Sequence, residues 1–174
     1  NVDNFHEYTN LFSGMIDDWR SAWGVDLPFY YAQIAPFIYE KNLSSQSLRD
    51  AQTKVLETTQ NTGMAVLLDI GEEYDIHPEN KKDVGERLSL HALKNEYNFD
   101  VIANGPLYKS HVRKGSRIEV SFDHVADGLM SDGPLTGFEI AGNDGVFHSA
   151  KAVISNDKII VSSKKVISPA HVRY

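Results

Sequence analysis

The sequence predicts a layered α/β unit followed by a small all-β module. Over the first hundred residues helical and strand-like patterns alternate, an order that requires crossover connections between parallel strands. One strand-like segment, MAVLLDI, is an unbroken apolar run, which is typical of a parallel strand covered on both faces. After about residue 100 the helical patterns give way to alternating strands. We therefore expect two domains, residues 1–100 and 101–174.

The first expected helix covers residues 6–24. Its apolar side chains recur every three or four positions from Tyr8 to Trp23, which is the spacing of an amphipathic helix. Gly24 suits the C-terminal end of this helix. Trp19 and Trp23 belong to the apolar stripe, so we expect both side chains in the core.

Two further helices are expected in the first domain. One covers residues 44–63, with Ser44 or Ser45 at its N-cap. The other covers residues 78–97, with Pro78 in its first turn. The element order of this domain is therefore α-β-α-β-α.

Two parallel strands are expected between these helices. Residues 27–37 are short, aromatic and bounded by Pro28 and Pro36, which favours a buried strand. The MAVLLDI run, residues 64–70, is the second strand. Two strands are too few for a self-sufficient sheet. We therefore expect further strands from an upstream part of the protein or from a partner chain.

The second domain has the pattern of antiparallel strands. Residues 116–124 alternate between apolar and polar side chains, as in a half-buried strand. Residues 135–163 contain strand-like runs separated by GNDG and SND, which are typical of hairpin turns. This region is therefore predicted to be all β.

Composition excludes several kinds of site. The net charge of −7 argues against a nucleic-acid surface, because phosphate binding needs a concentrated basic patch. No stretch approaches the ~18 apolar residues of a membrane helix. The absence of cysteine excludes disulfides, thiolate metal ligands and a cysteine nucleophile. We expect neither a nucleic acid nor a membrane as partner.

The segment DIGEEYDIHPENKK, residues 69–82, carries the candidate chemistry. It begins where the second strand ends, and ligand sites of open α/β sheets form beyond the carboxyl ends of the strands. His77 is a candidate general base, because a neighbouring carboxylate can fix its tautomer and stabilise the imidazolium. Pro78 restricts the backbone of the residue before it and so helps to fix His77.

Two other interpretations of this segment stay open. It could be a plain polar loop between a strand and a helix. It could also hold a metal ion, because oxygen and nitrogen ligands are available from Asp69, Glu72, Glu73, Asp75 and His77. The sequence has no spaced histidine pair and no EF-hand pattern, so we predict no metal site.

Five blocks spread over nearly the whole chain point to one family. They are LFSGMIDDWR, PFYYAQIAPF, LRDAQ, GMAVLLDIGEEYDIHPENKKDVGERL and GLMSDGPLTGFEIAGNDGVFHSAKAVI. Together they resemble the sialate O-acetylesterases, which are carbohydrate esterases of the SGNH (GDSL-like) hydrolase group. The resemblance implies that residues 1–100 are the C-terminal part of a flavodoxin-like α/β/α (SGNH hydrolase) layer. It implies a β-sandwich-like module for residues 101–174.

The resemblance also implies a mechanism without metal or cofactor. In such enzymes a serine attacks the acetyl carbonyl and a histidine, here His77, takes its proton. The family's serine motif, similar to GQSN, and its QGES(N) block do not occur in this sequence. We therefore expect this chain to supply the base but not the nucleophile. Its partner would be the missing N-terminal portion of the same protein, or a second copy through self-association.

The residue that orients His77 is left open by the sequence. Many SGNH hydrolases use an Asp-x-x-His pattern, which would place the acid at position 74, but that residue is Tyr74. Asp75 is our first choice for the acid. Glu72, Glu73 or a backbone carbonyl could hold the imidazole instead.

The resemblance further implies the substrate and its contacts. Gln33 and Arg49 correspond to family positions near the substrate side, so we expect both to bind substrate. The substrate would be an acetylated sugar, with sialic acid foremost. A bacterial enzyme of this kind would be periplasmic or extracellular. The alternative function is a carbohydrate-binding or interdomain module without catalysis.

Overall fold

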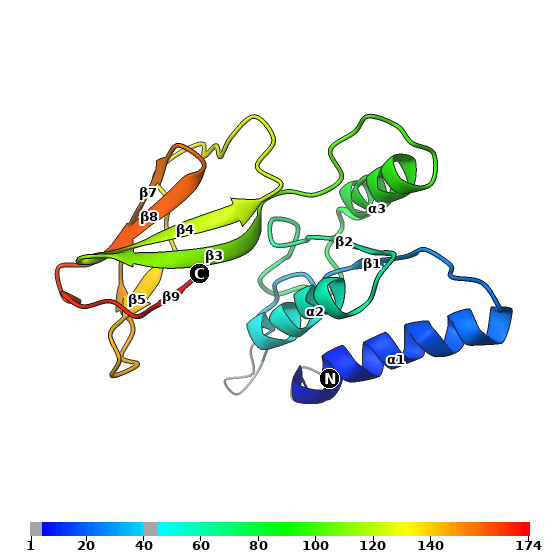
Figure 1. Cartoon of the computed structure of the whole chain (residues 1–174), viewed down its shortest axis with the longest axis horizontal. Coiled ribbons are helices and arrows are strands. Elements are labelled where there is room, and N and C mark those ends of the chain that lie inside the picture. Colours follow the sequence, from blue (N-terminus) through cyan, green and yellow to red (C-terminus); the bar gives the residue numbers. More distant parts are fainter. Residues whose placement is uncertain (1–4, 40–44) are drawn as a thin grey trace. The chain divides into compact units, whose positions relative to one another are not determined.

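The computed structural model describes residues 5–39 and 45–174 (Figure 1). Residue contacts divide the chain into two compact units, residues 1–104 and 105–174. The first unit contains α1 (Phe5–Trp23), β1 (Phe29–Ala32), α2 (Gln46–Thr58), β2 (Thr62–Ala65) and α3 (Lys81–Asn95). The predicted α-β-α-β-α order and the mixed α/β character are confirmed.

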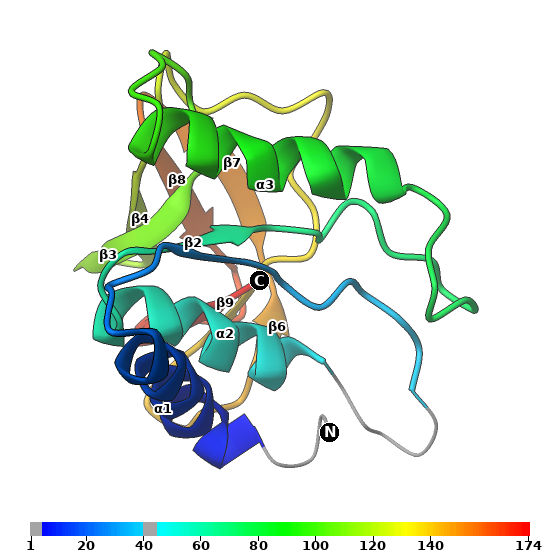
Figure 2. The same cartoon turned by 90° about the vertical axis from the view of Figure 1, so that its right-hand side faces the viewer.

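The first unit is a three-layer arrangement around two strands. β1 and β2 pair in parallel, with Tyr31 opposite Met64. Figure 2 shows these strands between α3 on one face and α1 with α2 on the other. On the α1/α2 face, Ile16 of α1 and Val55 of α2 are fully buried in one cluster with Tyr31 and Met64. On the opposite face, the ring of Tyr30 stacks on a histidine of α3 at 5.6 Å.

The strand expected over residues 64–70 is wrong in its bounds, because β2 ends at Ala65. The apolar residues that follow are buried without being part of a strand. Leu67 and Ile70 pack against α3 in a separate small cluster. A run of apolar residues indicates only that the residues are buried. A loop that is covered by a helix has the same sequence pattern as a buried strand.

Two expectations about the helices are also corrected. The third helix begins at Lys81 rather than at Pro78, because the side chain of Asn80 caps it by accepting from the backbone N–H of Asp83 at 3.2 Å. Trp19 and Trp23 are not in the core, since 50% and 67% of their surfaces are exposed. Ser45 is the N-cap of α2 but makes no side-chain cap bond, and Ser44 lies outside the described residues.

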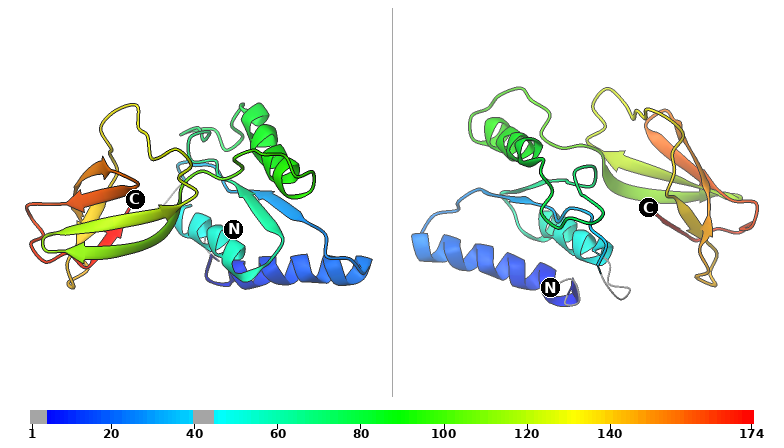
Figure 3. Two further views of the ribbon diagram at one scale, coloured as in Figure 1. Left: turned by 45° about the horizontal axis from the view of Figure 1, so that its top comes forward. Right: turned by 180° about the vertical axis from the view of Figure 1, so that it is seen from behind.

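The second unit is all β, as predicted, and its strands form two antiparallel sheets that share one core. The sheet orders are β3-β4-β8-β7 and β6-β5-β9 (Figure 3). Ile118, Ile140 and Val161, from three different strands, are fully buried in the shared cluster. The predicted hairpin at SND is confirmed between β7 and β8, where Asn156 has a φ of 53°. The strands are β3 (Leu107–Lys114), β4 (Arg117–Asp123), β5 (Glu139–Ala141), β6 (His148–Ser149), β7 (Lys151–Ser155), β8 (Lys158–Ser162) and β9 (His171–Arg173).

Candidate functional site

His77 lies in the loop of residues 66–80, which leaves the carboxyl end of β2. The start of this loop is anchored by Arg87 of α3. The guanidinium donates to the backbone carbonyl of Val66 and to both carboxylate oxygens of Asp69, at 2.7 and 2.6 Å. This bidentate bond to Arg87 is the main reason that the pKa of Asp69 lies below its ordinary value. One arginine therefore fixes the end of the strand and the first turn of the loop.

The loop after β2 is also tied to the segment that follows β1. A side chain at Gly71 would place its Cβ 2.3 Å from the carbonyl oxygen of Pro36, so the two backbones approach too closely for any other residue. Two residues further on, the backbone carbonyl of Glu73 accepts from the N–H of Ile38 at 3.0 Å. The carboxyl ends of both parallel strands thus meet in one loop cluster.

Within the loop, the acids bond to backbone groups rather than to the imidazole. Glu72 accepts from the N–H of Glu79 at 2.8 Å, which closes the loop across seven residues. Asp75 accepts from the N–H of His77 at 2.8 Å. The same Asp75 oxygen is 3.9 Å from Nδ1 of His77, which is too long for a hydrogen bond. The carboxylates therefore shape the loop that carries His77.

The imidazole of His77 is presented to solvent. Its side chain is 86% exposed, and no side chain among the described residues forms a hydrogen bond with it. A backbone fixed by Asp75 and Glu72, with an exposed ring, is an arrangement in which the imidazole can accept a proton from a group outside this chain. The loop can therefore present the imidazole of His77 as an accessible base, on a backbone that Asp75 and Glu72 hold in place.

Gln33 and Arg49 lie together at the carboxyl end of β1 and the start of α2. Gln33 is 95% buried, since only 5% of its surface is exposed, and its amide nitrogen donates to the carbonyl of Arg49 and to the hydroxyl of Thr53, both at 3.2 Å. Its Oε1 has no hydrogen-bond partner among the described residues. The guanidinium of Arg49 donates to the hydroxyl of Ser45, and burial lowers the pKa of Arg49.

These contacts join Gln33 to Arg49 but not to His77. Among residues 5–39 and 45–174, no hydrogen bond or ion pair connects either side chain with the imidazole. The unbonded oxygen of Gln33 is nevertheless a buried acceptor at the end of a strand, and such an atom normally finds a donor. The pair remains a candidate for contacts with groups that this chain does not contain.

Arg87 is the residue that the sequence reasoning missed. The sequence pattern offers Asp69 as a metal ligand, whereas both of its carboxylate oxygens accept hydrogen bonds from the guanidinium. The sequence does contain a sign of this contact. It places an aspartate at the end of the strand and an arginine on the helix after the loop, and these two residue types form bidentate pairs. Across the described ranges, no three histidine or acidic side chains gather in a way that could hold a metal ion.

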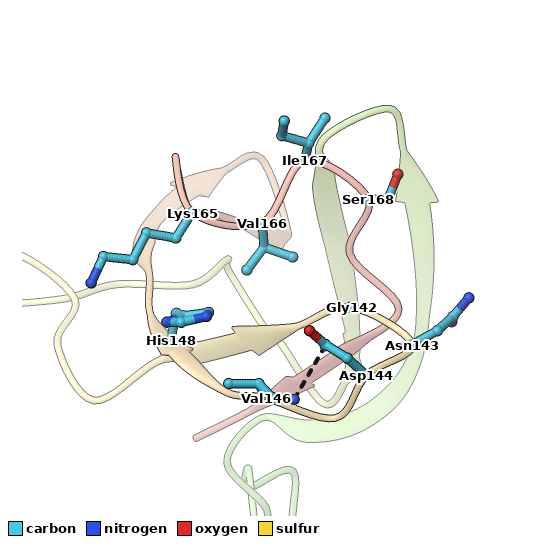
Figure 4. A pocket seen from close by; sticks show the side chains of 9 residues that line it. All are labelled: Gly142, Asn143, Asp144, Val146, His148, Lys165, Val166, Ile167 and Ser168. Atoms are coloured by element: carbon cyan, nitrogen blue, oxygen red, sulfur yellow. Dashed lines mark hydrogen bonds between the residues drawn. The ribbon is translucent and has the colours of Figure 1, made fainter.

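The second unit has an open hollow with a volume of about 310 Å³ (Figure 4). Asp144, on its rim, accepts from the N–H of Val146 at 3.2 Å. Ser168 and His148 both line the hollow, but Ser168 accepts from Arg113 at 3.1 Å and has no hydrogen bond to His148. The hollow therefore does not present a serine activated by a histidine.

No described helix combines the length and the apolar character needed to cross a bilayer.

Neither a family model nor a curated protein matches this sequence. A solved structure does match, that of a carbohydrate acetylesterase from Xanthomonas citri, with 37% identity and a TM-score of 0.86. The match covers 97% of this chain but 40% of that protein. Over nearly its whole length the chain is therefore similar to part of a carbohydrate esterase.

Proposed function

We propose that this chain is the base-carrying part of a carbohydrate O-acetylesterase. The observation that carries the proposal is the 37% identity to a carbohydrate acetylesterase over 97% of the chain. The loop geometry supports it, because His77 is accessible while its backbone is held by Asp75. The whole enzyme needs more than these residues, since the chain spans 40% of the length of its structural neighbour.

The proposed reaction is acyl transfer from a sugar oxygen to water. A serine outside this chain attacks the acetyl carbonyl while His77 accepts the serine proton. The imidazolium returns the proton to the sugar oxygen as the ester bond breaks, which leaves an acetyl-serine. Water, deprotonated by the same imidazole, then attacks the acetyl-serine. The bond between the acyl carbon and the serine oxygen breaks, acetate leaves, and the imidazolium returns its proton to the serine. This route uses no metal or cofactor.

The finer assignments follow from the sequence resemblance. The family motifs favour an acetylated sialic acid as the substrate, with Gln33 and Arg49 on the substrate side. A guanidinium suits the carboxylate that sialic acid carries. The same resemblance favours a periplasmic or extracellular enzyme of bacterial origin.

The test is a change of His77 to alanine in the assembled esterase. If His77 is the base, His77→Ala lowers kcat for an acetylated sugar by roughly 10³-fold or more, which is typical for the loss of a triad member. The measurement is the rate of acetate release at saturating substrate. His171→Ala is the matched control, because His171 is an exposed histidine on β9 in the second unit.

The control variant keeps normal turnover if the proposal is correct. Near-normal turnover in His77→Ala would instead remove His77 from the mechanism. Thermal unfolding of both variants separates a chemical effect from a folding defect. Because His77 is exposed, its truncation changes stability little.

A further inference from the structure

Two side chains of α3 bond to the backbone at the carboxyl end of β2. Nε2 of His91 donates to the carbonyl of Met64 at 3.1 Å, and the guanidinium of Arg87 donates to the carbonyl of Val66. The two donors are four residues apart on the helix, and the two acceptors are two residues apart. Four helical residues span about 6.0 Å and two extended residues about 6.6 Å, so the two spacings match. These bonds therefore fix the register of α3 along β2.

The direction of these contacts places the loop of residues 66–80 between two fixed points. The earlier donor on α3 bonds to the later acceptor, so α3 runs antiparallel to β2. The loop thus leaves β2 and enters α3 at the same end of the unit (Figure 2). Its last residue is Asn80, the N-cap of α3. A shift of α3 along β2 would therefore move the end of the loop relative to its start.

Arg87 holds the first part of the loop. Besides the carbonyl of Val66 it binds both carboxylate oxygens of Asp69, at 2.7 and 2.6 Å. Leu67 and Ile70 are buried against the same helix. Apolar packing keeps these two residues near α3 but is not directional, whereas a planar guanidinium that binds a carboxylate through two nitrogens also fixes its orientation. Arg87 therefore sets the direction in which the chain continues after Ile70.

The second half of the loop is held by bonds within itself. Glu72 accepts from the N–H of Glu79 at 2.8 Å, and Nζ of Lys81 donates to the carbonyl of Pro78 at 2.5 Å. These bonds give the segment around His77 its shape, but they do not connect it to β2. Across the described ranges, the side-chain hydrogen bonds that join residues 66–70 to α3 are those of Arg87.

We propose that Arg87 is a positioning residue for the base of the esterase and acts through Asp69 and the loop that carries His77. The proposal rests on the proposed function, because it affects catalysis only if His77 takes the serine proton. The side chain of His77 is 86% exposed, so packing does not hold the imidazole and its position follows that of the backbone. Proton transfer needs heavy atoms within about 2.6–3.2 Å, and a displacement of about 1 Å costs on the order of 10²-fold in rate. Arg87 therefore determines whether the base reaches the nucleophile.

The experiment weakens each half of the pair in the assembled esterase. Arg87→Lys keeps the positive charge but cannot form the bidentate bond, and Asp69→Asn keeps an acceptor oxygen but removes the negative charge. We expect each variant to lower kcat for acetate release by about tenfold to 10²-fold and to change KM by less than about threefold, because a misplaced base slows the chemistry without removing substrate contacts. Asp69→Asn guards against a folding defect, since 65% of the Asp69 side chain is exposed.

Glu86→Gln is the matched control. It breaks an exposed ion pair on the same helix, in which Glu86 lies 3.4 Å from Nζ of Lys82, and we expect unchanged kcat. Amide exchange, followed by mass spectrometry in the assembled esterase, gives a second readout. Peptides from residues 66–80 exchange faster in Arg87→Lys and Asp69→Asn than in the unchanged enzyme, whereas peptides from α1 and from the second unit do not.

A double-mutant cycle separates positioning of the base from an independent role of Arg87. If Arg87 acts through the imidazole, Arg87→Lys causes no further loss of kcat in the His77→Ala background. The proposal is overturned, with the esterase function intact, by a further loss there, by normal kcat in Arg87→Lys or Asp69→Asn, or by unchanged exchange of the loop. An equal loss of kcat in Glu86→Gln overturns it as well. Normal kcat in His77→Ala refutes the proposed base itself, and the positioning role with it.

Discussion

At the residue scale, the position of His77 could be predicted and its partner could not. A histidine before a proline at the end of an apolar run is visible in the sequence. Whether Asp75 bonds to the imidazole or to the backbone N–H of His77 cannot be told from the sequence pattern, because both groups lie two residues away along the chain. The structure has Asp75 on the backbone N–H of His77, and Glu72 on that of Glu79.

Asp75 can act in two ways, through its negative charge near the imidazole and through its hydrogen bond to the backbone N–H of His77, and two variants distinguish them. Asp75→Asn keeps an oxygen that can accept from His77 N–H but removes the charge 3.9 Å from the imidazole. Asp75→Ala removes both. We expect a smaller loss of kcat in Asp75→Asn than in His77→Ala, and a further loss in Asp75→Ala. Steady-state kinetics of the assembled esterase checks this order, with Glu72→Gln as the comparison.

A different order would assign the acid elsewhere. If Glu72→Gln lowers kcat as much as His77→Ala while both Asp75 variants are unimpaired, Glu72 orients the base. The loop then rearranges in the assembled enzyme, because Glu72 here bonds to the backbone of Glu79.

At the element scale, the sequence predicted the three helices and both strands of the first unit but misplaced several of their ends, and it missed β3 and β9 of the second unit. The 3.6-residue period of α1 and the parallel pairing of β1 with β2 are both observed. The end of β2 was misplaced, because Leu67 is buried by a helix rather than by neighbouring strands. Trp19 was misplaced because amphipathicity shows which face is apolar, not how far the covering layer extends.

The contact of α3 with β2 makes stability dependent on pH. His91 is 2% exposed, and Gly63 has no room for a side chain, because a Cβ there would lie 2.5 Å from Nδ1 of the imidazole. Burial lowers the pKa of His91 below its ordinary value of 6.5, and the charge of Lys94 acts in the same direction. The hydrogen bond to Met64 opposes this shift without cancelling it.

The sign of the effect follows from proton uptake. Because the fold favours the neutral imidazole, the unfolded chain binds more protons as the pH falls through about 6.5. We expect the free energy of unfolding to decrease below that pH, with a slope from this group of at most ~1.4 kcal/mol per pH unit. Urea denaturation at pH 7.5 and 5.5 measures it. His91→Gln, which can still donate to Met64, should lose this component, and an unchanged pH dependence would contradict the assignment.

At the scale of the whole molecule, the two units have separate cores, and all the predicted site residues lie in the first unit. The first unit holds His77 on a loop cluster at the carboxyl ends of β1 and β2. The second unit is all β, and its hollow does not present a histidine-activated serine. The sequence predicted both units, because periodicity changes from helical to alternating between them. It could not show that His91 and Arg87 of α3 bond to the backbone of Met64 and Val66, since such contacts depend on how the helix packs on the sheet.

A last prediction concerns the chain by itself. Acyl transfer by this mechanism needs a nucleophile within ~2.6–3.2 Å of the base. Among the described residues no serine bonds to His77, and Ser13 and Ser45 are engaged by Thr59 and Arg49. We expect the isolated 174 residues to release acetate from an acetylated sugar no faster than their own His77→Ala variant. Circular dichroism confirms that both are folded. Turnover well above that of the variant would mean that a serine of this chain is the nucleophile, and the enzyme would then need no second part.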